Sequence, residues 1–118
     1  MSKKMENSDK HLEIKRRLEK AQENKYANKK SEKKLMQFEE EIYLLRRKSQ
    51  QVYEELAQSF AETDLYPYII AAEEENRSDF VKQIESIDKA KENNLLELKK
   101  LYEEEEECGN QLRQMREE

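Results

Sequence analysis

The sequence predicts an all-α fold, an antiparallel helical hairpin of two long helices with coiled-coil-like heptad seams. The 118 residues include one proline, Pro67, near the midpoint, and one glycine, Gly109, near the end. Charged residues make up 43% of the chain, against roughly 25% in a typical globular domain, as is common in coiled coils. Apolar residues recur at spacings of four and three, a periodicity that a disordered chain of similar charge lacks.

The first helix is expected over about residues 9–62, after a frayed N-terminus over residues 1–8. Ser8 and Asp9 are good N-cap residues directly before the apolar pattern starts. Its seam, the row of side chains that faces the other helix, begins with Ile14, Leu18 and Ala21 and then meets polar residues between 22 and 34. The seam is expected to resume at these positions: Phe38, Ile42, Leu45, Ser49, Val52, Leu56 and Phe60.

The turn is expected over about residues 63–67, because Pro67 suits the first turn of a following helix. The second helix is then expected over about residues 67–117, so that residues 9–118 form a single hairpin. A continuous helix is preferred to a restart near Asp79 after a break at residues 76–78. Its seam alternates four and three throughout, which predicts a left-handed supercoil through these positions: Phe80, Ile84, Ile87, Lys91, Asn94, Leu98, Leu101, Glu105, Cys108, Leu112 and Met115.

The charge is distributed unevenly along the chain. Residues 1–34 hold 12 Lys or Arg against 6 Asp or Glu, whereas the C-terminal arm carries an acidic run from Glu103 to Glu107. An antiparallel hairpin lays these two arms side by side. Because an exposed ion pair contributes only about 0–1 kcal/mol, we expect the charges to set the register of the helices more than their stability.

No catalytic, cofactor or metal site is expected. His11 and Cys108 are the only histidine and cysteine, fewer than the four ligands of a structural zinc site, and the many glutamates belong to solvated helix faces. Nucleic acid is not expected as a partner, because acidic residues interrupt the basic arm and no aromatic platform accompanies it. No run approaches the roughly 20 apolar residues of a membrane span, and no signal peptide is seen, which predicts a cytoplasmic protein.

The turn region carries the most apolar stretch of the chain, Leu65-Tyr66-Pro67-Tyr68-Ile69-Ile70. It is either a plug that closes the hairpin or a surface on which a partner docks. A hairpin has little interior, so we expect its apolar residues to serve partner binding as well. The expected partner-binding residues are Phe38, Ile42, Leu45, Val52, Leu56, Phe60, Asp64, Tyr66, Ile69, Phe80, Ile84, Ile87, Leu98 and Leu101.

These features resemble the small helical-hairpin accessory proteins encoded beside LXG-type toxins of the Gram-positive type VII secretion system. The chain is similar to them in length, helical architecture and WXG100-like shape, although it has no Trp and hence no Trp-x-Gly turn. Phe60-Ala61-Glu62-Thr63-Asp64 matches the motif Phe-x-x-x-Asp, which is a secretion signal in one group of these accessory proteins. Here the motif lies at the turn and not in a C-terminal tail. The resemblance implies an adaptor or targeting chaperone that binds the toxin's helical N-terminal domain together with a second small helical protein. It also implies export with that partner without a signal peptide.

Two other classes of protein share this architecture. Coiled-coil stalk proteins of flagellar and type III export also present two long charged helices and engage an export ATPase. A structural coiled coil would form a homodimer along its seam. Binding to a toxin domain, to an ATPase or to a second copy distinguishes the three.

Overall fold

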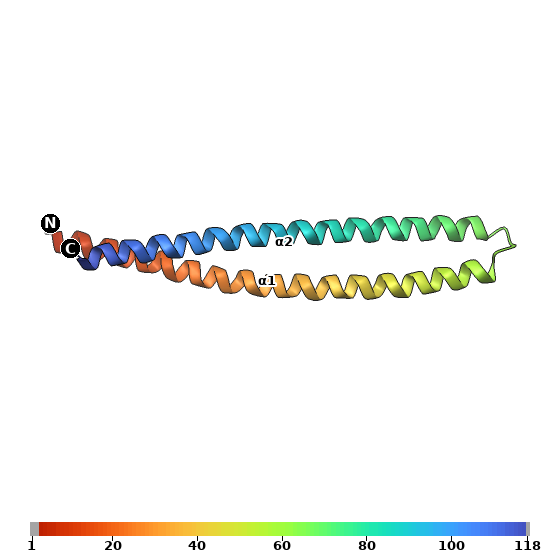
Figure 1. The fold of residues 1–118 in the computed structure, drawn as a ribbon, viewed down its shortest axis with the longest axis horizontal. Helices are drawn as coiled ribbons and strands as arrows, with labels where there is room; N and C mark the ends of the chain where they lie inside the picture. Colours follow the sequence, from red (N-terminus) through yellow and green to blue (C-terminus); the bar gives the residue numbers. More distant parts are fainter. Residues whose placement is uncertain (1–2, 118) are drawn as a thin grey trace. The chain divides into compact units, whose positions relative to one another are not determined.

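The computed structural model describes residues 3–117, with side chains from residue 8, and contains two helices joined by a short loop. Helix α1 spans Lys3–Ser59 and helix α2 spans Tyr66–Glu117 (Figure 1). The fold is an all-α helical hairpin, as the breaker-poor sequence predicted. Gly109 lies inside α2 in helical conformation. A single glycine in a helix interior costs only about 1 kcal/mol relative to alanine, which a helix of this length tolerates.

The hairpin comprises two compact units. The terminal unit combines α1 up to Glu32 with α2 from Glu92, and the loop unit contains residues 33–91. In each unit the helices are antiparallel, because residues with higher numbers on α1 contact residues with lower numbers on α2. In the terminal unit Arg17 meets Glu104 and Asn28 meets Asn94.

The helix limits differ modestly from the predicted ones. The segment expected to fray, residues 1–8, is helical from Lys3, and residues 1 and 2 lie outside the described part of the chain. Ser8 and Asp9 therefore lie inside α1. Their low helix propensity costs about 0.5 kcal/mol each relative to alanine. Helix α1 ends at Ser59 rather than near 62, and α2 starts at Tyr66, one residue before Pro67.

Thr63 organises the connecting loop. Its Oγ1 donates a hydrogen bond of 2.8 Å to the carbonyl oxygen of Phe60 and accepts one of 3.3 Å from the backbone N–H of Leu65. Pro67 falls in the first turn of α2, where its missing N–H leaves no hydrogen bond unmade.

Helix α2 passes through residues 76–78 without a break, as the continuous-helix interpretation predicted. Local polar contacts support the helix there. The guanidinium of Arg77 pairs with Glu73 one turn earlier at 2.6 Å, and the side-chain oxygen of Asn76 accepts a hydrogen bond of 2.7 Å from Arg46 on α1.

Candidate protein-interaction surfaces

The seam of α1 follows one frame from end to end. The positions turned toward α2 are buried or half-buried and alternate four and three without interruption: Ile14, Leu18, Ala21, Lys25, Asn28, Glu32, Leu35, Glu39, Ile42, Arg46, Ser49 and Tyr53. About half of these residues are charged or polar. The hairpin is therefore held by alternating apolar and polar layers rather than by a continuous apolar core.

A polar layer of the terminal unit centres on Asn28, which is 4% exposed. Its Nδ2 donates a hydrogen bond of 2.9 Å to the backbone carbonyl oxygen of Asn94 and a longer one of 3.4 Å to Glu97. One turn away, Lys25 Nζ lies 2.6 Å from Glu105 Oε1 and 4.2 Å from the ring centroid of Tyr102. That carboxylate oxygen is buried and accepts no hydrogen bond of good geometry, so the ammonium compensates its charge, and this pairing raises the pKa of Lys25.

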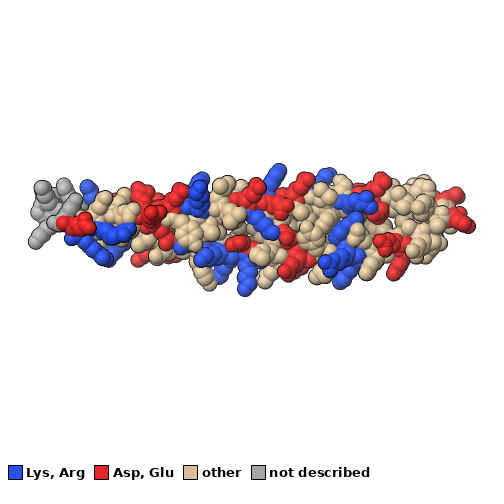
Figure 2. Space-filling model, in the orientation of Figure 1, with Lys and Arg blue, Asp and Glu red and all other residues tan. Residues whose placement is uncertain are grey.

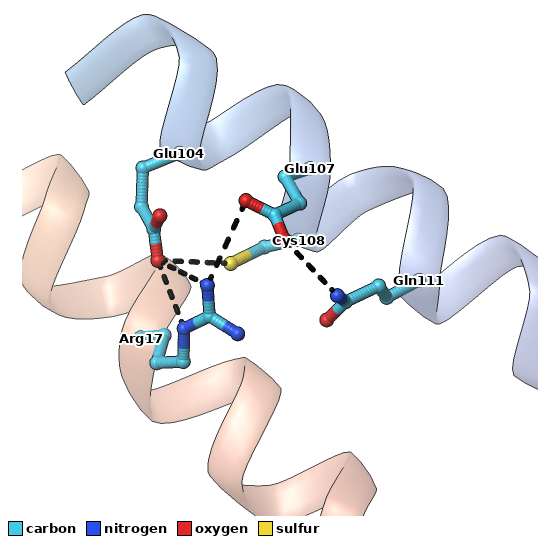
Figure 3. Close-up of polar contacts among 5 residues, drawn as sticks. All are labelled: Arg17, Glu104, Glu107, Cys108 and Gln111. Carbon is cyan, nitrogen blue, oxygen red and sulfur yellow. Dashed lines mark hydrogen bonds and ion pairs between the residues drawn. The ribbon is translucent and has the colours of Figure 1, made fainter. Parts of the chain in front are cut away.

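Nearer the chain ends, Arg17 of α1 reaches across to Glu104 and Glu107 of α2, and the Cys108 thiol lies beside Glu104 (Figure 3). Its Nε donates a hydrogen bond of 2.8 Å to Glu104 Oε1, and its Nη2 lies 2.6 Å from the same oxygen. Cys108 is fully buried under this pair, and burial raises the pKa of its thiol. The predicted pairing of the basic N-terminal arm with the run from Glu103 to Glu107 is confirmed by these contacts.

In the loop unit the buried apolar centre consists of Ile42 and Ile87. Arg46, 8% exposed, donates a hydrogen bond from Nη1 to Asn76 and lies 5.9 Å from the ring centroid of Phe80, a cation–π geometry. Glu39 accepts a hydrogen bond of 2.5 Å from Lys91, which raises the pKa of that lysine.

The predicted α1 seam is wrong at four positions in the loop unit. Phe38, Leu45 and Val52 are each about half exposed, and Leu56 is 36% exposed. Each of the first three stands one residue before a true seam position, Glu39, Arg46 or Tyr53. The prediction chose the apolar residue of each neighbouring pair. In the structure the seam instead continues at the spacing that begins at Ile14, and the charged residues at those positions, such as Glu39 and Arg46, have partners on α2. Continuing the frame of Lys25, Asn28 and Glu32 past residue 34 would have found them.

The predicted α2 seam is confirmed, because every one of its positions is buried or half-buried. Phe80 packs edge-on against Tyr43 of α1, with ring centroids 5.3 Å apart. Of the expected partner-binding residues, Ile42, Phe80, Ile84, Ile87, Leu98 and Leu101 are thus engaged within the hairpin.

The loop region leaves apolar side chains exposed. Tyr68 is 76% exposed, and Leu65 and Tyr66 are also exposed; we call these three residues the tip cluster. Phe60 and Ile69 are half-buried, and Asp64 is exposed. The plug interpretation therefore accounts for Phe60 and Ile69 and leaves the tip cluster without a role in the hairpin.

Further large apolar side chains outside the seam are exposed on both helices. Several were not singled out from the sequence, because charged neighbours conceal them: Tyr26, Met36, Leu44 and Val81. On the face drawn in Figure 2, acidic and basic side chains are interspersed with uncharged ones along the molecule. Within residues 3–117, no group of three or more His, Cys, Asp or Glu is arranged to hold a metal ion, and neither helix has an apolar stretch long enough to cross a bilayer. No family model, no curated protein and no solved structure matches this chain.

Proposed function

We propose that the chain is a non-catalytic adaptor that binds a helical domain of another protein through the exposed apolar side chains of its loop region. The observation that carries this proposal is the tip cluster, which the hairpin does not bury. Tyr and Leu side chains are large, and an exposed patch of them on a small protein is typical of a docking site.

The surrounding structure supports a role of this kind. More large hydrophobic side chains are exposed than buried in the part of the chain that the structure describes. A hairpin of two helices gains further apolar burial only by packing against other helices. The polar layers meanwhile hold the two helices of each unit in register.

The resemblance to LXG-toxin accessory proteins supplies the candidate partner. In this proposal the chain binds the helical N-terminal domain of a type VII secreted toxin in the cytoplasm, with a second small helical protein, and targets the toxin for export. The Phe-x-x-x-Asp motif of residues 60–64 adds a candidate secretion signal, because Asp64 is exposed and available to a receptor.

Co-purification of the chain with such a toxin domain, followed by a titration of affinity, tests the proposal. The double variant Leu65→Ala/Tyr68→Ala is expected to lose about tenfold or more in affinity, because truncated aromatic anchors are the usual hot spots. Tyr26→Ala is the matched control, since Tyr26 is 64% exposed and lies in the terminal unit. Circular dichroism should show equal helicity for all three proteins.

Two results would overturn the proposal. If the toxin domain does not bind and an export ATPase does, the chain is a stalk protein. If the toxin domain binds the tip variant as tightly as the unmodified chain, the tip cluster is not the docking site.

A further inference from the structure

A stripe of three apolar side chains runs along α1 in the loop unit. It consists of Phe38, Leu45 and Val52, which are 49%, 59% and 52% exposed. Residues seven apart lie on one line of a helix in a left-handed coiled coil, so the three side chains form a single row beside the seam. An apolar row with this spacing is typical of a helix face that packs against another helix.

Beside Phe38, at one end of the stripe, the side that faces α2 is a shallow groove. Leu35, Phe38 and Ile87 supply its apolar part, and the small side chains of Ser86 and Ala90 leave space beside Phe38.

The other side of the stripe is a row of charges. Lys34, Glu41, Lys48 and Glu55 each stand three residues after or four residues before a stripe residue, and therefore adjoin it on the helix surface. All four side chains are exposed, and none forms an ion pair with another residue of the described chain. The signs alternate strictly along this charge row.

Two copies of the charge row place opposite charges together when they run antiparallel. In an antiparallel pair of stripes centred on Leu45, Phe38 lies across from Val52 of the second copy. The same alignment sets Lys34 across from Glu55 of the second copy and Glu41 across from Lys48 of the second copy. In a parallel pair related by a two-fold axis, the two charge rows would instead lie on opposite sides of the contact and would not meet.

We propose that a second copy of this chain docks antiparallel on the stripe, with a two-fold axis near Leu45. A two-fold interface uses the same patch on both copies, and both the stripe and the charge row meet that requirement. The contact is small for an obligate dimer, so the dimer forms in a concentration-dependent equilibrium. It does not involve the tip cluster, and it is separate from the proposed adaptor function.

Sedimentation velocity of the full chain across a series of micromolar concentrations tests the apolar part of the proposal. The unmodified chain should shift from monomer to dimer, and Leu45→Asp should remain monomeric with unchanged helicity. Leu44→Asp is the matched control: Leu44 is 54% exposed, adjoins Leu45 in sequence and projects from a different side of α1. It should dimerise as the unmodified chain does.

A charge-reversal cycle tests the antiparallel register. Glu41→Lys alone and Lys48→Glu alone each place like charges together twice in the dimer, and should weaken dimerisation by about tenfold. The double variant Glu41→Lys/Lys48→Glu restores opposite pairs and should return the dissociation constant to that of the unmodified chain. Because neither residue pairs within the chain, stability should be equal in all four proteins.

Several outcomes would overturn the proposal. An unmodified chain that stays monomeric throughout, a dimer that tolerates Leu45→Asp, or a double variant that dimerises no better than the single ones would each do so. If the chain is monomeric and Leu45→Asp abolishes binding to the toxin domain instead, the stripe belongs to that partner. A monomeric Leu45→Asp variant that still binds the toxin domain would separate this inference from the adaptor function.

Discussion

Asn28 Nδ2 of α1 donates a hydrogen bond of 2.9 Å to the backbone carbonyl oxygen of Asn94 on α2. The amide is almost fully buried in a row otherwise suited to aliphatic side chains. A shift of one helix along the other would leave this amide buried without a partner, at a cost of about 1–3 kcal/mol. The pair therefore fixes the register of the terminal unit.

Replacing the buried amide should increase stability. Asn28→Leu is expected to raise the free energy of unfolding by about 1 kcal/mol, because a polar residue in a seam sets register at a cost in stability. Urea unfolding followed by circular dichroism measures the change. Asn24→Leu, at an exposed position of α1, is the control and should be neutral. A destabilised Asn28→Leu protein would show that the hydrogen bond contributes more than the apolar contact that replaces it.

Gly109 offers a second stabilising substitution. It lies in the interior of α2, and a Cβ placed there meets no atom within 4 Å. Gly109→Ala should therefore add about 0.5–1 kcal/mol to the free energy of unfolding, since it removes backbone freedom from the unfolded chain. Thermal unfolding measures this gain, and Ala27→Gly, at an exposed helical position, should lose a similar amount. No gain at Gly109 would indicate that the end of α2 is not helical in solution.

Stability should fall at alkaline pH in a defined direction. Close pairing with the carboxylates of Glu105 and Glu39 raises the pKa of Lys25 and Lys91, respectively, above the ordinary value of 10.5. The folded state thus holds these protons more tightly than the unfolded state. The resulting stability is fully present below pH 10.5 and is lost as the pH rises through the folded-state pKa values.

Urea midpoints measured from neutral pH to above 10.5 check this expectation. The double variant Lys25→Gln/Lys91→Gln should begin at a lower midpoint and decline less over the alkaline range. Parallel declines in the two proteins would mean that the ion pairs do not form in solution.

Cys108 should be protected from alkylation in the folded protein. Its side chain has no exposed surface, and burial raises the pKa of the thiol, so little thiolate is available at neutral pH. Iodoacetamide labelling followed by mass spectrometry should show slow modification that accelerates in urea. The control is Ser78→Cys in a Cys108→Ala background, because Ser78 is exposed and should label quickly. Equal rates at the two positions would contradict the burial of Cys108.

Much of the hairpin is predictable from local chemistry. Without Gly or Pro between Lys3 and Ser59, nothing stops α1, and Pro67 marks the restart because its ring suits a first turn. The α2 seam was predictable because its apolar residues, among them Ile84 and Leu98, follow one unbroken heptad frame. The charge pairing across the terminal unit followed from the opposite signs of the two arms.

The α1 seam was not predictable by choosing apolar residues. Phe38 and Arg46 illustrate the error, since the apolar side chain is half exposed and the charged one is buried. A buried guanidinium is tolerated only where its charge and its N–H groups find partners. The carboxylate of Glu73 lies 3.9 Å from Nη2 of Arg46, and Asn76 of α2 accepts its hydrogen bond. That partner lies 30 residues away in sequence, so no local pattern reveals it.

The amino-acid sequence by itself thus determined the two helices, the place of the turn, the antiparallel pairing of charges and the face that α2 presents. These features depend on backbone propensity and on periodicity within one helix. Only the tertiary structure decided which side of α1 faces α2, and hence which apolar residues remain exposed in the stripe and the tip cluster. That choice depends on whether each polar residue in the seam finds a partner on the opposite helix, which is a property of the pair and not of either helix alone.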